Sequence, residues 1–115
     1  MISLSENSFS KKYRLRKKTG YIIKKGHRKA FENIIIYYMV EENPKLAVII
    51  SSKVTNSVGR NRIKRWTREF FRKNKNKMDN YGIILVYKKK SEKMKNEELC
   101  NKLNTIFFEA GIYKT

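Results

Sequence analysis

Residues 56–73 (NSVGRNRIKRWTREFFRK) show the clearest hydrophobic pattern in the chain, and its period is that of an α-helix. At about 100° per residue, one face collects Gly59, Ile63, Trp66 and Phe70, with Asn56 in line at the start. The opposite face collects Asn61, Lys64, Arg65, Arg68 and Arg72. The pattern predicts an amphipathic helix with an apolar face to bury and an arginine face to expose. Asn56 is the expected N-cap, because its amide oxygen can accept from a free first-turn N–H.

Three further segments have the pattern of strands. Residues 31–40 are dense in β-branched and aromatic side chains. Alternation places Phe31, Ile35, Tyr37 and Met39 on one face and Ile34, Ile36, Tyr38 and Val40 on the other. After a turn at residues 41–44, we expect an antiparallel return strand over residues 45–53. Tyr81–Tyr87 is continuously apolar, which indicates a strand covered on both faces.

Two more helices complete the expected elements. The pattern over residues 16–25 predicts a short helix that ends at Gly26, and residues 96–110 predict a final helix that ends at Gly111. Residues 1–12 are expected to be irregular and disordered. A chain of 115 residues has room for one modest core, so we predict a single α+β domain over residues 1–115.

The net charge narrows the class of partner. The chain has 28 lysines and arginines against 10 acidic residues, a formal net charge of +18. Nucleic acid is therefore the first candidate partner, and an anionic membrane surface is the second. No apolar run is long enough to cross a membrane, and the N-terminus has no secretory pattern. Cys100 is the only cysteine, which excludes an internal disulfide and favours a cytoplasmic location.

The arginines are concentrated in the helix pattern. Five of the eight lie between residues 60 and 72, and a guanidinium can hold two phosphate oxygens at once. Residues 53–77 contain ten bases and one acid, Glu69, whereas a face that is merely solvated mixes both signs. This imbalance favours phosphate recognition. Glu69 is expected to hold Arg65 and Lys73 in place at spacings of four residues.

The sequence has little that suits catalysis. Cleavage of RNA by a protein alone needs a histidine pair or a carboxylate cluster that holds metal ions. His27 is the only histidine, and the carboxylates are scattered without metal-binding spacing. Cys100 lies on the apolar stripe of the final helix and is expected in the core. We therefore predict no catalytic residue and no metal site in a chain that binds nucleic acid.

The strand face with Phe31, Ile35, Tyr37 and Met39 suggests a second binding surface. It is aromatic and flanked by cations, a combination that suits stacking on unpaired bases. The alternative is that these side chains are core residues beneath the final helix. The pattern alone leaves both interpretations open.

The run GRNRIKRWTREFFR resembles the signature helix of the bacterial ribonuclease P protein component, and KLAVIISSKVTNSV is similar to the strand and turn before it. The resemblance is most specific in residues 45–72. It implies an α/β sandwich with a mixed sheet, in the order α-β-β-α-β-α with room for an extra short strand. It also implies a left-handed β-α-β crossover, although about 98% of such crossovers are right-handed in general.

The same resemblance implies a protein subunit that binds the catalytic RNA of ribonuclease P and the 5′ leader of precursor tRNA, and so assists endonucleolytic removal of the leader. The RNA subunit would supply the chemistry and hold most of the Mg²⁺. The protein would bind no ion tightly, contact no membrane and be monomeric apart from the RNA. Docking on the RNA subunit would use Arg60, Asn61, Arg62, Lys64, Arg65, Arg68 and Arg72. The leader would lie in a cleft between the N-terminal helix and the sheet, against Ile23, Phe31, Ile35, Tyr37, Ser51 and Lys53.

Two other classes fit the composition. One is a pure RNA-binding module, such as a ribosomal or RNA-chaperone protein. The other is a DNA-binding protein that places residues 61–72 in a major groove. The RNA that copurifies would separate the first class from ribonuclease P, because the latter predicts one abundant structured species rather than a broad mixture.

Overall fold

The computed structural model describes residues 13–15, 17–88 and 95–114, so the prediction for residues 1–12 falls outside it. Among the described helices, none is long and apolar enough to cross a membrane. The elements are α2 (Thr19–Lys25), β1 (His27–Ala30), β2 (Ile34–Val40), β3 (Lys45–Ile50), α3 (Ser57–Asn74), the 3-10 helix η2 (Lys75–Lys77), β4 (Tyr81–Tyr87) and α4 (Asn96–Glu109). The predicted arginine helix, the apolar strand and the final helix are confirmed as α3, β4 and α4.

Three predicted boundaries differ. Helix α2 begins at Thr19 rather than at residue 16, because Lys18 has a left-handed backbone (φ 69°) that an α-helix cannot continue. Phe31 lies in the turn between β1 and β2 instead of in a strand, and its N–H donates to the Ile34 carbonyl at 2.8 Å. β3 ends at Ile50, which leaves residues 51–53 in the turn before α3.

The sheet has the order β1-β2-β4-β3. β4 pairs antiparallel with β2 and parallel with β3. The expectation that residues 45–53 pair with the preceding strand is therefore wrong, because β4 is inserted between β2 and β3. A continuously apolar strand such as β4 suits this interior position, where both of its faces are covered.

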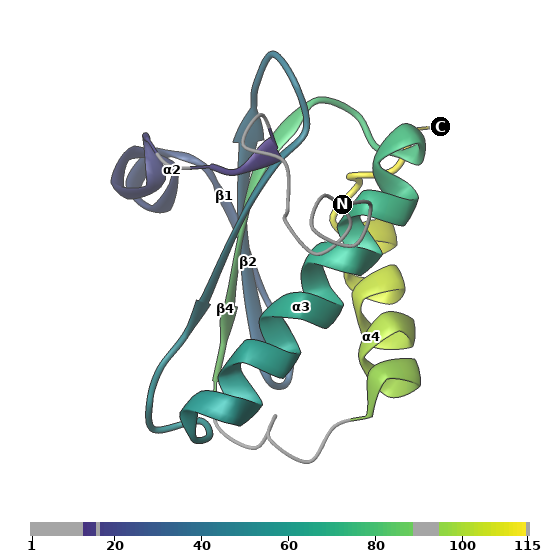
Figure 1. The fold of residues 1–115 in the computed structure, drawn as a ribbon. Helices are drawn as coiled ribbons and strands as arrows, with labels where there is room; N and C mark the ends of the chain where they lie inside the picture. The colour runs from purple at the N-terminus through teal and green to yellow at the C-terminus, as the bar shows by residue number, and fades with distance from the viewer. Residues whose placement is uncertain (1–12, 16, 89–94, 115) are drawn as a thin grey trace, which may run out of the picture.

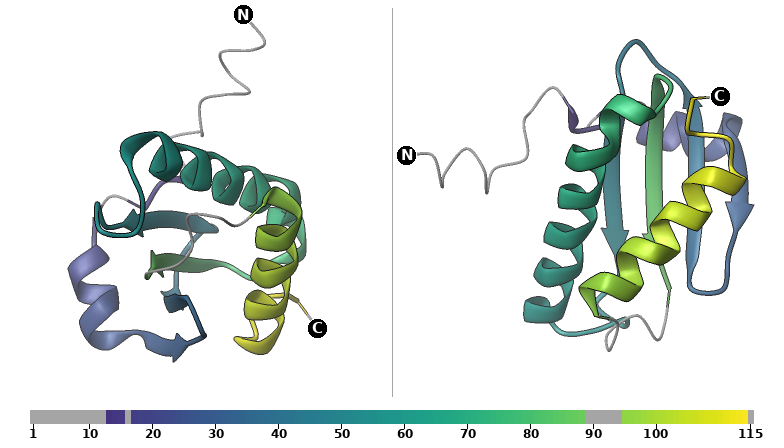
Figure 2. Two further views of the ribbon diagram at one scale, coloured as in Figure 1. Left: turned by 90° about the horizontal axis from the view of Figure 1, so that it is seen from below. Right: turned by 90° about the vertical axis from the view of Figure 1, so that its right-hand side faces the viewer.

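The crossover from β3 through α3 to β4 is left-handed. In the right-hand view of Figure 2, α3 lies between the viewer and the sheet. When the page is turned so that β3 and β4 point upward, β4 lies to the left of β3. The resemblance predicted this hand correctly, against the general rule for parallel strands.

The helices cover the sheet unequally. α3 and α4 pack on one face, and the short α2 packs on the other (Figure 1). The main core lies under α3 and α4, and its fully buried residues include Ile34, Ile36, Ile83, Leu85, Phe71, Leu103 and Phe107. Because α2 has only two turns, part of the opposite sheet face stays open.

A smaller apolar cluster anchors α2 on that second face. It consists of Leu15, Ile22 and Ile84, with Tyr37 among the half-buried residues packed against it. Gly82 of β4 makes this packing possible, since a Cβ at this position would lie 3.2 Å from Ile22 Cδ1. The absence of a side chain at residue 82 thus lets the N-terminal segment lie close to the sheet.

Candidate nucleic-acid interface

Helix α3 is fixed at its first turn. Asn56 Oδ1 accepts the Gly59 N–H at 2.9 Å, which confirms the predicted N-cap. Gly59 lies so close to Thr55 that any side chain at residue 59 would collide with it. The Arg60 side chain also contacts Thr55, since its Nη1 donates to the Thr55 carbonyl at 2.9 Å. One of the predicted docking arginines is thus partly engaged within the protein.

The buried face of α3 is formed by Ile63, Thr67, Phe70 and Phe71, while Trp66, predicted at its centre, is only half-buried. The sequence pattern did not assign Thr67 to the buried face, because threonine is polar. Its Oγ1 donates to the Ile63 carbonyl at 2.7 Å, which leaves the hydroxyl of Tyr87 to donate the 2.6 Å bond between the two side chains. Burial raises the pKa of Tyr87. This buried hydrogen bond fixes the rotation of α3 on β4.

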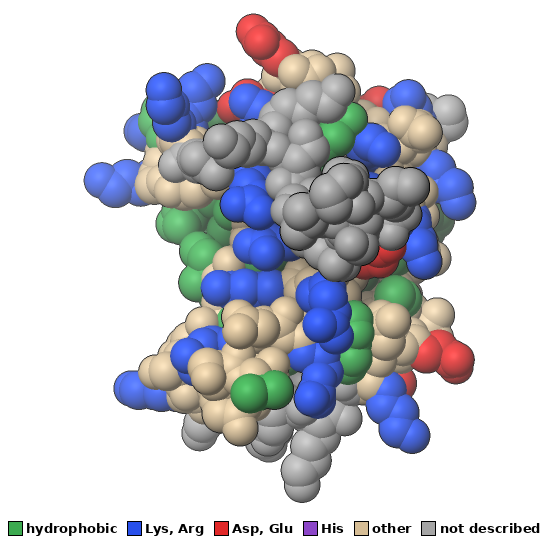
Figure 3. All heavy atoms as spheres, in the orientation of Figure 1, with side chains coloured by type: hydrophobic (Ala, Val, Ile, Leu, Met, Phe, Trp, Pro, Cys, Tyr) green, Lys and Arg blue, Asp and Glu red, His purple; other side chains and the backbone are tan. Residues whose placement is uncertain are grey.

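The opposite face of α3 is cationic, as predicted. Asn61, Arg62, Arg65 and Arg72 are exposed, and Lys64 and Arg68 are half-exposed. Figure 3 shows lysine and arginine side chains gathered over this part of the molecule. Within the described part of the chain, Arg62, Lys64 and Arg65 have no side-chain hydrogen bond or ion pair. Their donors are therefore available to an external anion.

Glu69 has a different partner from the predicted ones. Its carboxylate accepts from Arg72 Nε at 3.1 Å and from Arg72 Nη2 at 2.5 Å, rather than holding Arg65 and Lys73. These bonds, together with the charges of Arg72 and Lys73, lower the pKa of Glu69. Glu69 pairs with Arg72 at a spacing of three residues rather than with Arg65 or Lys73 at a spacing of four, because the two N–H donors of a guanidinium match the two oxygens of a carboxylate.

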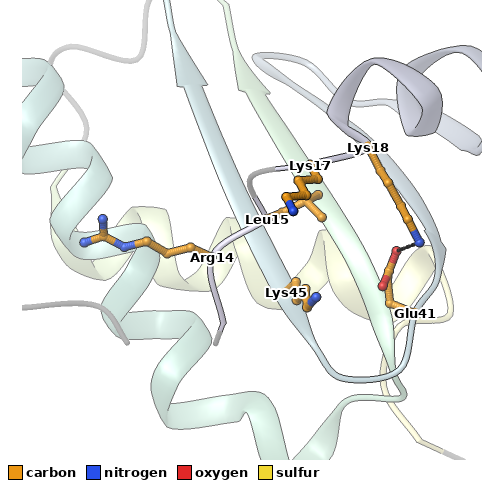
Figure 4. Close-up of a pocket in the computed structure, with 6 residues that line it drawn as sticks. All are labelled: Arg14, Leu15, Lys17, Lys18, Glu41 and Lys45. Carbon is orange, nitrogen blue, oxygen red and sulfur yellow. Dashed lines mark ion pairs between the residues drawn. The ribbon is translucent and has the colours of Figure 1, made fainter. Parts of the chain in front are cut away.

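Arg14 belongs to the same cationic surface, although the sequence pattern did not indicate it. It forms a bridge with Leu46 at the edge of β3, and in Figure 4 its side chain points toward α3. Its Nε is buried and has no hydrogen bond to another described residue. Burial, and then the charge of Arg14, lowers the pKa of Arg68. Arg14 thus adds a guanidinium to the charges that act on Arg68.

The sheet face beneath α2 is the second candidate surface. Register places Tyr37, Ile84 and Ala47 in one row across the strands, and Ile35, Val86 and Ile49 in the next. Tyr37 and Ile35 are half-buried, and Ile49 is 42% exposed. The guanidinium carbon of Arg28 lies 6.0 Å from the centre of the Tyr37 ring. Apolar surface is visible below α2 in Figure 3.

With one exception, the predicted leader residues lie on α2, on β2 and in the turn after β3. Ile23 on α2 is 40% exposed, and Ser51 and Lys53 are exposed in the turn that follows β3. There the Lys53 N–H donates to Ser51 Oγ at 3.0 Å. Phe31 is the exception. It packs against the main core and lines a hollow beside α4, so its predicted place on the Tyr37 face is wrong. The turn before β2 breaks the alternation that the prediction assumed.

The residues with acid–base or metal-binding chemistry do not converge. Among the described residues, no group of three His, Cys, Asp or Glu side chains could hold a metal ion. His27 is exposed, and its ring centre lies 5.2 Å from that of Tyr38. Cys100 is half-buried against the core, where its Sγ donates to Asn96 Oδ1 at 3.4 Å. What the described side chains do provide is a cationic helix face on α3 and a partly open apolar sheet face beside α2.

Comparisons with known proteins agree with this geometry. The family model described as Ribonuclease P matches residues 9–111. The ribonuclease P protein component of Clostridium kluyveri is 35% identical over 111 residues, which cover 89% of this chain and 97% of the relative. That of Syntrophus aciditrophicus is 34% identical and covers 86% of this chain and 87% of the relative.

The fold also matches a solved structure. It is that of a Staphylococcus aureus RNase P protein mutant with defective mRNA degradation activity, with a TM-score of 0.83 and 29% identity over 97% of this chain and 96% of the other. The general function of this family is RNA binding and tRNA processing. The chain therefore belongs to the family of ribonuclease P protein components, which form part of a ribonuclease together with an RNA subunit.

Proposed function

We propose that this chain is the non-catalytic protein subunit of ribonuclease P, which binds the catalytic RNA subunit and the 5′ leader of precursor tRNA and so assists endonucleolytic removal of the leader. The outward face of α3 supports this proposal most directly. Its cationic side chains lie on a helix whose other face is locked in the core by Thr67 and Tyr87.

The RNA subunit docks on α3 in this proposal. Arg62, Arg65 and Arg68 recur every three residues and so follow one side of the helix, and Arg14 adds a fourth guanidinium beside Arg68. Planar guanidinium groups suit the paired oxygens of backbone phosphates. Because the helix is already fixed on the sheet, little ordering of the backbone is needed on binding.

The 5′ leader lies on the open sheet face under α2. Tyr37 and the neighbouring aliphatic residues Ile35 and Ile49 provide a flat apolar surface for unpaired bases. Arg28, whose guanidinium carbon lies 6.0 Å from the centre of the Tyr37 ring, and Lys53, exposed in the turn after β3, are cations that a backbone crossing this face would meet in this proposal. A single-stranded leader suits such a surface better than a duplex, whose bases are stacked within the helix.

The chemistry is assigned to the RNA subunit. The described carboxylates have no arrangement that fits a protein-held Mg²⁺. We therefore place the Mg²⁺ of the reaction mainly on the RNA subunit, and the protein acts by binding and positioning. The protein alone is expected to leave precursor tRNA intact at any Mg²⁺ concentration.

Reconstituted cleavage tests this function. Precursor tRNA with a leader is incubated with the protein alone, with the RNA subunit alone and with both. We expect no cleavage by the protein alone, and with both components a higher kcat/KM for the leader-bearing precursor than with RNA alone. Equal kcat/KM with and without the protein would contradict the proposal. An mRNA incubated with the protein alone tests separately for mRNA degradation, the activity that is defective in the S. aureus mutant.

A further inference from the structure

A small cavity shares Arg14 with the cationic surface of α3, and its other lining residues belong to neither surface described above. It has a volume of about 320 Å³ and is lined by Arg14, Leu15, Lys17, Lys18, Glu41 and Lys45 (Figure 4). The segment that precedes α2 forms one wall, and the turn after β2 together with the first residue of β3 forms the other. At about 30 Å³ per liquid water, the cavity has the volume of roughly ten waters, which leaves room for a hydrated anionic group.

The charges that line this cavity are unbalanced. Of the described residues that line it, four are cations, and Glu41 is the only carboxylate. Glu41 is already paired, because Lys18 Nζ lies 3.6 Å from its Oε2 and its side chain is only 9% exposed. Lys17 and Lys45 have no hydrogen bond or ion pair to any other described side chain. Two ammonium groups therefore share a cavity without a counter-ion from the described chain.

The backbone holds these lysines in place. The Leu15 N–H donates to the Leu46 carbonyl at 2.9 Å, which attaches the wall with Lys17 to β3. Lys18 has a left-handed backbone (φ 69°), an unfavourable conformation for a residue with a side chain. Gly82 lies directly across from Lys45 in the sheet, and it leaves room for Glu41 of the cavity wall, since a Cβ there would be 2.9 Å from Glu41 Cγ. The packing of the segment thus places Lys17 and Lys45 on the walls of one cavity.

We propose that this cavity binds a backbone phosphate of RNA through Lys17 and Lys45. The proposal rests on the proposed function, to which it adds a third contact between docking helix and leader face. Its position suits this role: Arg14 reaches from the cavity wall toward α3, and Lys45 lies one side-chain row from Ala47 and Tyr37. None of the described lining residues is aromatic and could stack on a base, and ammonium groups are point charges that suit a single phosphate.

The test is the double substitution Lys17→Gln with Lys45→Gln in the full chain. Its affinity is measured against the RNA subunit, and, in the assembled ribonucleoprotein, against leader-bearing precursor tRNA, each between 50 and 400 mM salt. Loss of one phosphate contact should lower the log–log salt slope by about 0.7–0.9, so the affinity of the variant relative to the wild type should change by roughly four- to sevenfold between 50 and 400 mM salt. The melting temperature should not fall, because neither ammonium group has a hydrogen bond or ion pair to another described side chain.

Lys29→Gln with Lys114→Gln is the matched control, since it removes the same charge from exposed positions away from the cavity. A loss confined to the RNA subunit assigns the phosphate to that RNA, and a loss confined to the precursor assigns it to the leader. Either result supports the proposal. If the double variant loses no more than the control in both titrations while the wild type binds both RNAs, the cavity proposal is wrong and the proposed function stands. Failure of the wild type to bind either RNA would overturn both.

Discussion

Tyr37 combines the two features that a base-stacking residue needs. One part of its ring packs against the small cluster of Leu15, Ile22 and Ile84, and the rest is open beside Arg28. The interpretation of this side chain as core beneath the final helix does not fit, since α4 packs on the opposite face of the sheet. The position of Tyr37 is therefore rigid, and its ring is still accessible.

Tyr37→Ala should weaken binding of leader-bearing precursor tRNA about five- to a hundred-fold in the assembled ribonucleoprotein, because one base–aromatic contact contributes about 1–3 kcal/mol. Tyr37→Phe is the control and should bind like the wild type. Mature tRNA has no leader and should bind all three proteins equally. An equal loss for precursor and mature tRNA would show that Tyr37 supports the fold or the docking surface instead.

Thr67→Val tests the buried hydrogen bond beneath the docking helix. The substitution keeps the shape but leaves the Tyr87 hydroxyl without its acceptor, which should lower the free energy of unfolding by about 1–3 kcal/mol. Combining it with Tyr87→Phe removes both polar groups and should restore most of the loss. Urea titrations of the two single variants and the double variant measure this coupling. Strict additivity would show that the bond contributes nothing.

The roles of single residues could be predicted where they follow from the local sequence pattern. The predictions failed where a role depends on contacts with residues distant in sequence. The cap at Asn56 follows from its place at the start of the helix pattern, and it is confirmed. Arg14 could not be identified, because its environment is made by β3 and α3, which are distant in sequence. Phe31 was misplaced because the turn that removes it from the strand has no glycine or proline to mark it.

Elements with a strong internal period were predictable, but the order of the strands in the sheet was not. α3 and β4 have nearly the predicted bounds, since each is encoded by an uninterrupted pattern. The place of β3 depends on β4, which follows thirty residues later and enters the sheet between β2 and β3. Nothing in residues 45–53 indicates that choice. The left hand of the crossover likewise came from the family resemblance and not from the pattern.

Asn56→Ala should destabilise the protein by about 0.5–2 kcal/mol, because the Gly59 N–H at the start of α3 loses its acceptor. Asn56→Ser keeps a capping oxygen and should recover most of this loss. Thermal or urea unfolding of the three proteins provides the comparison. If Asn56→Ser and Asn56→Ala unfold alike, the cap does not stabilise α3.

At the scale of the whole molecule, the charge is distributed unevenly. The α4 side contains several of the few acids, Glu32, Glu97, Glu98 and Glu109, whereas α3 has Glu69 alone. Arg14 and the cavity lysines continue the cationic surface of α3 around the edge of β3. An RNA partner should therefore bind the α3 and β3 side, and α4 should face away from it.

Binding of the RNA subunit should depend steeply on salt. If roughly six to ten phosphates are neutralised, affinity should fall about 10³–10⁵-fold between 50 and 200 mM monovalent salt. Filter binding or fluorescence titration at four or five salt concentrations gives the slope. Less than a tenfold loss over this range would show that phosphate contacts do not dominate docking.

The most direct test of the account is the affinity of the RNA subunit for Arg62→Gln combined with Arg65→Gln. Both side chains are exposed and unpaired within the described chain, so the fold should be unaffected, within about 0.5 kcal/mol. Each lost charge-assisted contact is worth about 1.5 kcal/mol or roughly tenfold, so Kd should rise about a hundredfold. The control variant, Lys29→Gln combined with Lys114→Gln, should raise Kd far less. Equal Kd values for the two double variants at unchanged melting temperature would contradict docking through α3.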